Sequence, residues 1–303
     1  MNAKIISIHI ISLMIFASIS FGGELLAPPV MKESLPNTNG LLAEINHTSA
    51  DFVPQSVIDL AEKLHSNGIK FIFFDVDDTL VYNESYKNKM KSAIFQFLVK
   101  NLKIKMKQEE IVIKIAKRQK DLNKKRLKLR PTDVFGLFDI KLTSRHEKEL
   151  SDMIKVSDYI KTDPRQIALF KYLHSQGFYL GVISDNLRAV TEANLKALGV
   201  FNFFKNNIVT ASEGRGKPGS IETMLEHFGI EQNRSALMVG DDQVIDIEGA
   251  LNLGMLAFHI KNYNQLFEPY KISFPEQLDE LKCKSIKFTN RFDVGKITLK
   301  SSL

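Results

Sequence analysis

Residues 71–80, with the sequence FIFFDVDDTL, decide the fold of this chain. The first four residues form a short, continuous run of apolar β-formers, which is typical of a strand buried on both faces of a parallel sheet. Acidic residues follow at once, so Asp75 and Asp77 are expected at the carboxyl end of this strand. Ligands of parallel α/β sheets bind beyond the carboxyl ends of the strands, and the two carboxylates therefore mark a candidate site.

Four more apolar segments of strand length alternate with segments of helical periodicity. This alternation predicts an α/β fold with a doubly wound parallel sheet. The further strands are expected at residues 179–183, 207–210, 236–239 and 255–260, and the helices at residues 55–68, 165–175, 188–198, 219–228 and 246–253.

An insert at residues 83–161 interrupts this alternation. It has helical periodicity, no convincing strand, and a dense basic stretch at residues 87–130. We interpret it as an α-helical cap domain inserted into a core of residues 55–82 and 162–262, with residues 263–303 as a C-terminal extension. The basic stretch is expected to be a solvated helix face, and steering of an anionic substrate is the alternative.

The first residues have the features of an export signal. Lys4 precedes an apolar run at residues 5–21, which is shorter than the ~20 residues that a membrane-spanning helix prefers. We expect residues 1–22 to be a cleaved signal peptide, so that the protein is periplasmic or secreted, and residues 23–54 to be a linker. A retained membrane anchor is the alternative, and only then would the chain contact a membrane. Cys283 is the single cysteine, so an intramolecular disulfide is excluded.

The formal net charge is +6 and the sequence pI is about 9.1. A basic surface favours anionic partners, among which a phosphorylated small molecule agrees with the motifs described next. The basic stretch has few aromatic residues for base stacking, so specific nucleic-acid recognition has no support.

Asp75 and Asp77 can divide the work of phosphoryl transfer. One carboxylate can attack phosphorus, while the other protonates the leaving oxygen and later activates water. Two carboxylates so close together stay ionised only if a cation offsets them, which indicates a hard divalent metal such as Mg²⁺.

Two further segments can bind phosphate. Ser184, Asp185 and Asn186 follow the expected second strand, where a hydroxyl and exposed backbone N–H groups can hold phosphate oxygens. The alternative is that Ser184 caps the following helix. Lys217 lies in an expected Gly-Lys-Pro turn, from which its ammonium could neutralise a carboxylate and a phosphoryl oxygen.

A last acidic segment follows the expected strand at residues 236–239. Asp241 is placed to ligate Mg²⁺, which prefers oxygen ligands and needs few protein carboxylates. Asp246 can either lie near the metal or cap the helix that it opens.

Taken in this order, each after an apolar strand, these four segments resemble the motifs of the haloacid dehalogenase superfamily of phosphatases. The resemblance covers roughly residues 70–261. The family pattern DxDx(T/V) matches Asp75, Asp77 and Thr79; its strand-end Ser/Thr matches Ser184; its lysine matches Lys217; and GD(D/S)xxxD matches Gly240, Asp241, Asp242 and Asp246.

The resemblance implies a Rossmann-like core with a helical cap, an aspartyl-phosphate formed on Asp75, and Asp77 as general acid and base. It also implies Mg²⁺ held by Asp75, Asp241 and the carbonyl of Asp77, with Asp246 nearby. Asp185 departs from the family pattern, because a carboxylate beside the phosphate-binding serine could repel substrate unless it points away.

Within the family, Asp77 favours hydrolysis of phosphate esters, because dehalogenases and phosphonate-cleaving relatives carry no acid at this position. A phosphomutase is the first alternative, although a mutase must shield its aspartyl-phosphate from water. A non-catalytic binding protein that uses the basic cap is the second alternative, which Mg²⁺-dependent turnover of an aryl phosphate would exclude.

Overall fold

The computed structural model describes residues 53–102, 106–125, 127, 129–210 and 216–282, with only the backbone for residues 216–218. The expected signal peptide, nearly all of the expected linker, and residues 283–303 lie outside the described residues. In the described part of the chain, no helix has the length and apolar character that crossing a membrane requires.

The sheet has five parallel strands in the order β3-β2-β1-β4-β5. Because β1 pairs with β2 on one side and β4 on the other, the chain reverses its direction of winding between β1 and β4. Such a switch point is where parallel α/β sheets bind ligands. The strands are β1 (Phe71–Phe74), β2 (Tyr179–Ser184), β3 (Ile208–Thr210), β4 (Ala236–Gly240) and β5 (Leu256–His259).

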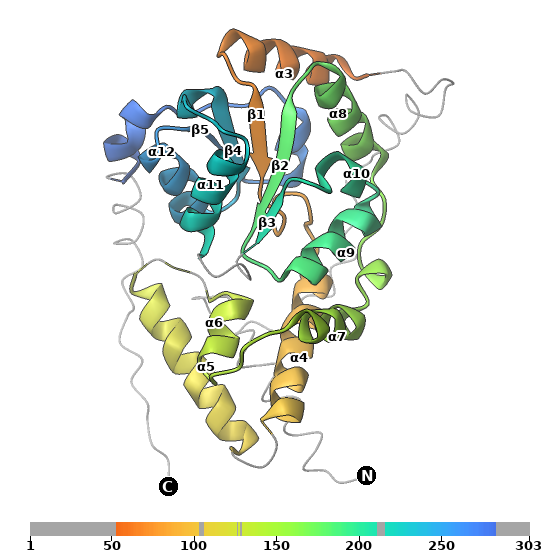
Figure 1. Ribbon diagram of the computed structural model, residues 1–303, viewed down its shortest axis with the longest axis vertical. Coiled ribbons are helices and arrows are strands. Elements are labelled where there is room, and N and C mark those ends of the chain that lie inside the picture. The colour runs from red at the N-terminus through yellow and green to blue at the C-terminus, as the bar shows by residue number, and fades with distance from the viewer. Residues whose placement is uncertain (1–52, 103–105, 126, 128, 211–215, 283–303) are drawn as a thin grey trace, which may run out of the picture.

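Side chains of β1 enter hydrophobic clusters on both faces of the sheet. Ile72 and Phe74 belong to one cluster and Phe73 to the other, as the two-residue period of a strand requires. Helices cover both faces, as Figure 1 shows. The first cluster includes side chains of α3 (Gln55–Ser66), α8 (Pro164–Ser175), α9 (Arg188–Leu198) and α10 (Phe201–Phe204), and the second includes side chains of α11 (Gly216–His227) and α12 (Gly249–Asn252).

The insert consists of helices, with no strand among its described residues, and lies beyond the carboxyl ends of the strands (Figure 1). The predicted fold class, a Rossmann-like parallel sheet with an inserted helical cap, is therefore confirmed. Phe97 is fully buried in the cap and packs edge-on against Phe135 with ring centroids 5.6 Å apart. The cap helices are α4 (Glu84–Asn101), α5 (Gln108–Asn123), α6 (Pro131–Gly136) and α7 (Ser144–Ile154), followed by η1 (Val156–Asp158).

Two elements differ from the expectation. The helix expected at residues 246–253 begins earlier, as a π-helical turn η4 (Gln243–Glu248) that continues into α12. The expected Gly-Lys-Pro turn is instead the start of α11, whose first turn tolerates Pro218 because the N–H groups there have no helical partner.

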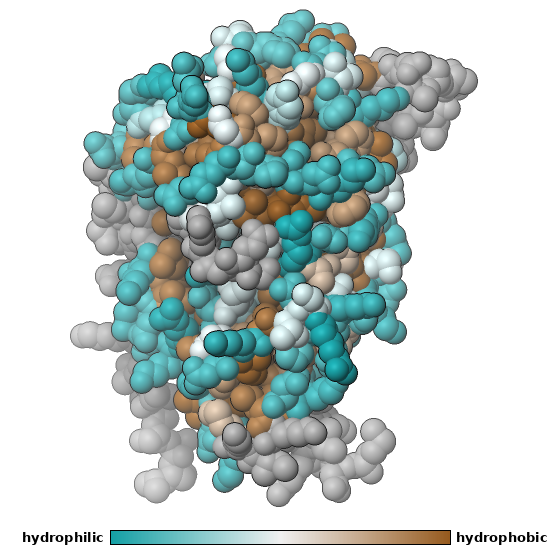
Figure 2. Space-filling model, in the orientation of Figure 1, coloured by the Kyte–Doolittle hydropathy of each residue, from teal (hydrophilic) through white to brown (hydrophobic). Residues whose placement is uncertain are grey.

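The packed core also continues past residue 262. Short helices η5 (Tyr263–Phe267) and η6 (Pro275–Gln277) follow β5. Tyr270 is fully buried and stacks on Phe258 at 4.3 Å between ring centroids. On the face shown in Figure 2, hydrophilic residues predominate on the outside of both core and cap, and hydrophobic ones gather in smaller areas.

Candidate active site

Asp75 lies directly beyond β1 at the switch point of the sheet. Its backbone N–H donates to the carbonyl of Val239 at 2.9 Å, which continues the pairing of β1 with β4 for one more residue. The hydroxyl of Thr79 donates to Asp75 Oδ2 at 3.1 Å. The side chain is only 4% exposed. Backbone pairing and the Thr79 bond therefore fix the orientation of this carboxylate.

A tight loop follows Asp75 and carries Asp77. The N–H groups of Leu80 and Val81 both donate to the carbonyl of Val76, at 2.9 and 2.8 Å. Asp78 has a left-handed backbone with φ of 64°, a conformation that Asp adopts more readily than most residues. This loop returns the chain sharply, so that Asp75 and Asp77 both line the same cavity.

Asn186 holds Asp77 in place. Its Nδ2 donates to Asp77 Oδ2 at 3.2 Å and also lies 3.2 Å from the sulfur of Met90 in the cap. Its Oδ1 accepts from the N–H of Leu187 at 2.8 Å. Asn186 was expected to bind phosphate, and the structure adds a positioning contact to the second aspartate that spacing alone did not indicate.

Three carboxylates meet beside β1 and β4. One oxygen each of Asp75, Asp241 and Asp246 lies within 4.8 Å of the others, and Asp75 and Asp246 are buried. Oxygen donors of this kind suit a hard divalent cation such as Mg²⁺, so the residues fit the metal that the sequence implies. Among the described residues, the carboxylate of Asp77 does not belong to this cluster. This agrees with the expectation that Asp77 would ligate the metal through its backbone carbonyl.

Asp242 positions Asp246. Its side chain caps η4 by accepting from the N–H groups of Val244 and Ile245 at 2.9 and 3.0 Å. Its own N–H donates to Asp246 Oδ2 at 3.0 Å. The cap residue of this helix is therefore Asp242, and Asp246 points into the acidic cluster.

His259 is a neighbour of the site that the sequence analysis did not single out. Its Nε2 donates to the backbone carbonyl of Asp241 at 2.9 Å. Burial lowers the pKa of His259 below its ordinary value, so the ring is neutral at neutral pH. Its place at the end of β5, next to β4, is the signal that could have indicated it.

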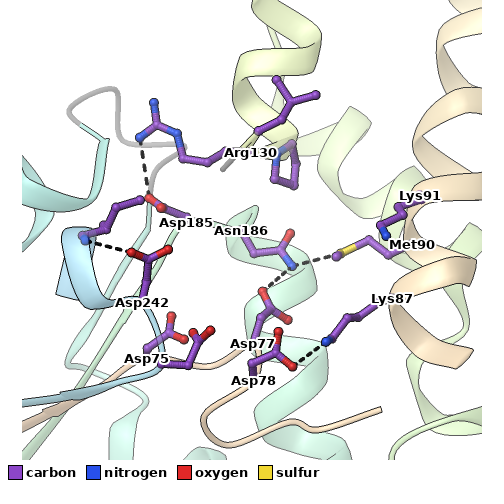
Figure 3. Close-up of a pocket in the computed structure, with 14 residues that line it drawn as sticks. Asp75, Asp77, Asp78, Lys87, Met90, Lys91, Arg130, Asp185, Asn186 and Asp242 are labelled. Carbon is purple, nitrogen blue, oxygen red and sulfur yellow. Dashed lines mark hydrogen bonds and ion pairs between the residues drawn. The ribbon is translucent and has the colours of Figure 1, made fainter. Parts of the chain in front are cut away.

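The cavity over these carboxylates has a volume of about 220 Å³ and lies between core and cap. Figure 3 shows Asp75, Asp77 and Asp78 on the core side, and Lys87, Met90 and Lys91 projecting from α4. The lining residues are Asp75, Asp77, Asp78, Lys87, Met90, Lys91, Leu129, Arg130, Pro131, Asp185, Asn186, Asp241, Asp242 and Ile245.

Asp185 lines this cavity and faces a cap arginine. Arg130 Nη1 lies 3.7 Å from Asp185 Oδ1, and the same guanidinium donates to both oxygens of Asp133, at 2.8 and 3.0 Å. The repulsion expected from Asp185 is thus offset by a positive charge from the cap. Lys87, Lys91 and Arg130 belong to the basic stretch, but sequence spacing could not indicate which of its residues face the cavity.

The phosphate-binding roles expected of Ser184 and Lys217 stay predictions. Ser184 is fully buried at the end of β2, and its hydroxyl accepts from the N–H of Asn186 at 3.1 Å. It does not cap α9, whose cap residue is Leu187. Lys217 is in the first turn of α11, and its side chain lies outside the described residues.

Fold and site together define a class of protein: a parallel α/β enzyme whose carboxylates gather at the switch point under a helical cap. The family model for haloacid dehalogenase-like hydrolases matches residues 72–260, and the chain belongs to this family. The predicted family and the prediction of a hydrolytic enzyme are therefore confirmed.

Two relatives are archaeal proteins named glyceraldehyde 3-phosphate phosphatase. The one from Methanothermobacter thermautotrophicus is 26% identical over 64% of this chain and 86% of the relative. The one from Methanocaldococcus jannaschii is 29% identical over 63% of this chain and 85% of the relative. Among solved structures, an HAD phosphatase from Thermococcus onnurineus is similar with a TM-score of 0.47 and 22% identity, covering 64% of this chain and 86% of that one.

Proposed function

We propose that this hydrolase is a Mg²⁺-dependent phosphomonoesterase in which Asp75 is the nucleophile and Asp77 the general acid and base. The observation that supports it best is the convergence of two separately positioned carboxylates on one cavity. Thr79 orients Asp75 and Asn186 orients Asp77, so each has a fixed place relative to a bound phosphoryl group. The phosphatase names of the relatives agree with this proposal.

In the first step, a carboxylate oxygen of Asp75 forms a bond to phosphorus while the bond from phosphorus to the ester oxygen breaks. The carboxyl group of Asp77 donates its proton to the departing alkoxide, which leaves as an alcohol. In the second step, Asp77 takes a proton from water, whose oxygen attacks phosphorus and releases Asp75 and inorganic phosphate.

Asp75, Asp241 and Asp246 would hold the metal. When bound, a divalent cation supplies positive charge that offsets these carboxylates and the phosphoryl oxygens. Asp242 keeps Asp246 directed into the cluster through its backbone N–H. Asn186, donating to Asp77 and contacting Met90 of the cap, keeps the acid above the phosphoryl position when the cap is in place.

The substrate that we propose is a small phosphorylated metabolite. The relatives named for glyceraldehyde 3-phosphate support this size, as does the cavity of about 220 Å³. Pockets for drug-sized ligands are larger, at roughly 300–1,000 Å³. From the apolar run after Lys4, we further propose that the enzyme acts outside the cytoplasm after cleavage of residues 1–22.

The test is release of phosphate from p-nitrophenyl phosphate by the purified full chain, with Mg²⁺ and with a chelator. Asp75→Asn retains the shape of the side chain but cannot attack phosphorus, so turnover should fall by about three orders of magnitude or more. Asp152→Asn, on the exposed surface of α7, is the matched control and should leave turnover unchanged.

Chelator-insensitive turnover would contradict the metal assignment. Near-normal turnover of the Asp75→Asn enzyme would contradict the nucleophile. Release of free phosphate also separates a phosphatase from a phosphomutase, which would return the group to a sugar phosphate.

A further inference from the structure

The first cap helix contacts the core through two side chains on one of its faces. Tyr86 and Met90 lie four residues apart on α4 and therefore on the same face of this helix. The hydroxyl of Tyr86 donates to Asn194 Oδ1 of α9 at 2.8 Å, and both side chains are fully buried. One turn further along α4, Met90 contacts Asn186, which lies just before α9. The buried bond therefore fixes the place of α4 beside the site, and the place of Met90 with it.

The side-chain amide of Asn186 links Met90 to the proposed general acid. Its Oδ1 accepts from the N–H of Leu187 at 2.8 Å, which defines the direction of the amide. The two hydrogens on its Nδ2 are then directed to Asp77 Oδ2 and to Met90 Sδ, which each lie 3.2 Å from the nitrogen (Figure 3). One amide group thus contacts the second aspartate and the cap helix at the same time.

Met90 gives one N–H of this amide an acceptor. Asn186 is only 2% exposed, and a buried polar hydrogen without an acceptor costs free energy. A thioether sulfur is a weak acceptor, so Met90 contributes more to the direction of the amide than to its stability. Without the sulfur, the amide of Asn186 would turn towards other acceptors, and the hydrogen that it donates to Asp77 would turn with it.

We propose that Met90 is a positioning residue that keeps Asp77 in line with the leaving group of the substrate, acting through Asn186. This inference rests on the proposed phosphomonoesterase function and deepens it at the same site. It makes proton donation by Asp77 depend on the cap, because the sulfur belongs to α4 and the aspartate to the core. The competing role of Met90 is packing alone, since its side chain also contacts the hydrophobic core.

The test compares two aromatic substrates of similar size with the purified full chain and Mg²⁺. The phenolate of p-nitrophenyl phosphate departs with little protonation, whereas the alkoxide of benzyl phosphate requires a proton from the acid. Met90→Leu retains the volume of the side chain and removes the acceptor. It should lower kcat/KM for benzyl phosphate about tenfold, a part of the roughly 10²–10⁴-fold that general acid catalysis provides. The kcat/KM for p-nitrophenyl phosphate should fall by less than about twofold, because its leaving group needs little protonation.

Two further variants separate the acceptor from packing. Met90→Gln has a similar length and an oxygen that can accept from Asn186, so it should retain most of the wild-type kcat/KM for benzyl phosphate. The matched control is Met153→Leu, the same change at a partly buried cap residue of α7 that does not line the cavity, and it should leave both substrates unaffected. Equal losses for the two substrates in Met90→Leu, or no loss, would overturn the proposal. A loss in Met90→Gln as large as that in Met90→Leu would also overturn it.

Asp77→Asn separates this inference from the proposed function. It removes the acid itself, so the loss in kcat/KM should be far larger for benzyl phosphate than for p-nitrophenyl phosphate. If Asp77→Asn shows this difference and Met90→Leu does not, only the role of Met90 is contradicted. If Asp77→Asn reduces kcat/KM equally for both substrates, or the wild type hydrolyses neither, the proposed function is contradicted and the role of Met90 with it.

Discussion

A methyl group on Gly240 would lie 2.2 Å from Asp246 Oδ2 and 2.4 Å from Asp246 Cγ. Gly240 is the last residue of β4, and Asp241 follows it directly. The absence of a side chain at this position lets the Asp246 carboxylate pack against the strand and join Asp75 and Asp241. The acidic cluster therefore requires glycine at this position because of the space that a side chain would occupy. The backbone conformation of Gly240 does not itself require glycine.

Gly240→Ala should move Asp246 out of the cluster. Overpacking of this kind destabilises proteins by about 1–3 kcal/mol, and displacement of a metal ligand should raise the Mg²⁺ concentration needed for half-maximal activity. Chemical unfolding and an Mg²⁺ titration of activity measure the two effects. Gly136→Ala, where an added methyl meets nothing within 4 Å, is the matched control. An unchanged Mg²⁺ requirement in Gly240→Ala would contradict the role given to this residue.

At the scale of single residues, sequence reasoning located the groups that depend on strand ends. Asp75 and Asp241 follow buried apolar runs, and the parallel sheet brings such ends together whatever the rest of the chain does. The contacts from Asn186 to Asp77 and from Arg130 to Asp185 could not be predicted, because they join segments whose distance depends on how the cap packs.

At the scale of elements, the strands were predicted to within a residue or two, because runs buried on both faces are apolar throughout. The start of the helix after β4 was not predicted correctly, because the sequence allows either Asp242 or Asp246 to be its cap residue. Only the structure shows that Asp242 accepts the two N–H groups at the start of η4. The short helix α10 was also not predicted, because four residues are too few to show a period.

A buried hydrogen bond between two side chains joins a cap helix to a core helix. Tyr86 of α4 donates to Asn194 Oδ1 of α9 at 2.8 Å, and both side chains are fully buried. Tyr86→Phe removes the hydroxyl that donates to the buried Oδ1 of Asn194. We therefore expect the free energy of unfolding to fall by about 1–3 kcal/mol. Chemical denaturation measures it, with the exposed Tyr179→Phe as control. Equal stability of the two variants would show that the bond contributes nothing net.

Asp163 lies where the chain returns from the cap to the core, and its contribution to the free energy of unfolding depends on pH. Its carboxylate caps α8 by accepting from the N–H of Arg165 at 2.8 Å, and it also pairs with the Arg165 guanidinium at 2.9 Å. Burial raises the pKa of Asp163, but the bonds from Arg165 and Tyr263 outweigh it, and the net pKa is below the ordinary 3.8. The stabilisation is therefore complete above the unfolded-state pKa and is lost as pH falls through the folded-state pKa.

Asp163→Ala should accordingly cost about 1 kcal/mol at neutral pH, the usual value of a helix cap. Near pH 3, which is below the unfolded-state pKa of about 3.9, part of this stabilisation is lost and the difference from the wild type should shrink. Urea unfolding at the two pH values measures both differences. A gap that stays constant would mean that the charge of Asp163 is irrelevant to its effect.

At the scale of the whole molecule, the helical insert and its place as a cap over the site were predicted, but the basic residues of the insert that face the cavity were not. That position divides the basic stretch into two groups. Lys87, Lys91 and Arg130 face the cavity, whereas Lys117, Lys120 and Lys124 are exposed along or just after α5 and do not line it. The second group can act on substrate only through its long-range field.

Charge reversal of that second group tests whether the field matters. The formal net charge of +6 attracts an anionic substrate, while the aspartates of the cavity repel it. Replacing Lys117, Lys120 and Lys124 together by Glu should lower kcat/KM several-fold at low ionic strength, with kcat unchanged, because only the encounter is affected. The difference should fade as salt rises from about 10 mM to about 0.5 M, where the Debye length shortens from roughly 30 Å to a few Å.

A matched triple variant decides whether position or net charge is responsible. Lys63, Lys205 and Lys271 are exposed on the core, and their replacement by Glu changes the total charge by the same amount. Lys63 lies on α3, at the opposite end of the molecule from the cap (Figure 1). If the field of α5 steers substrate, the cap variant should show the larger loss at low salt. Identical salt dependence of the wild type and the cap variant would mean that these lysines form only a solvated surface.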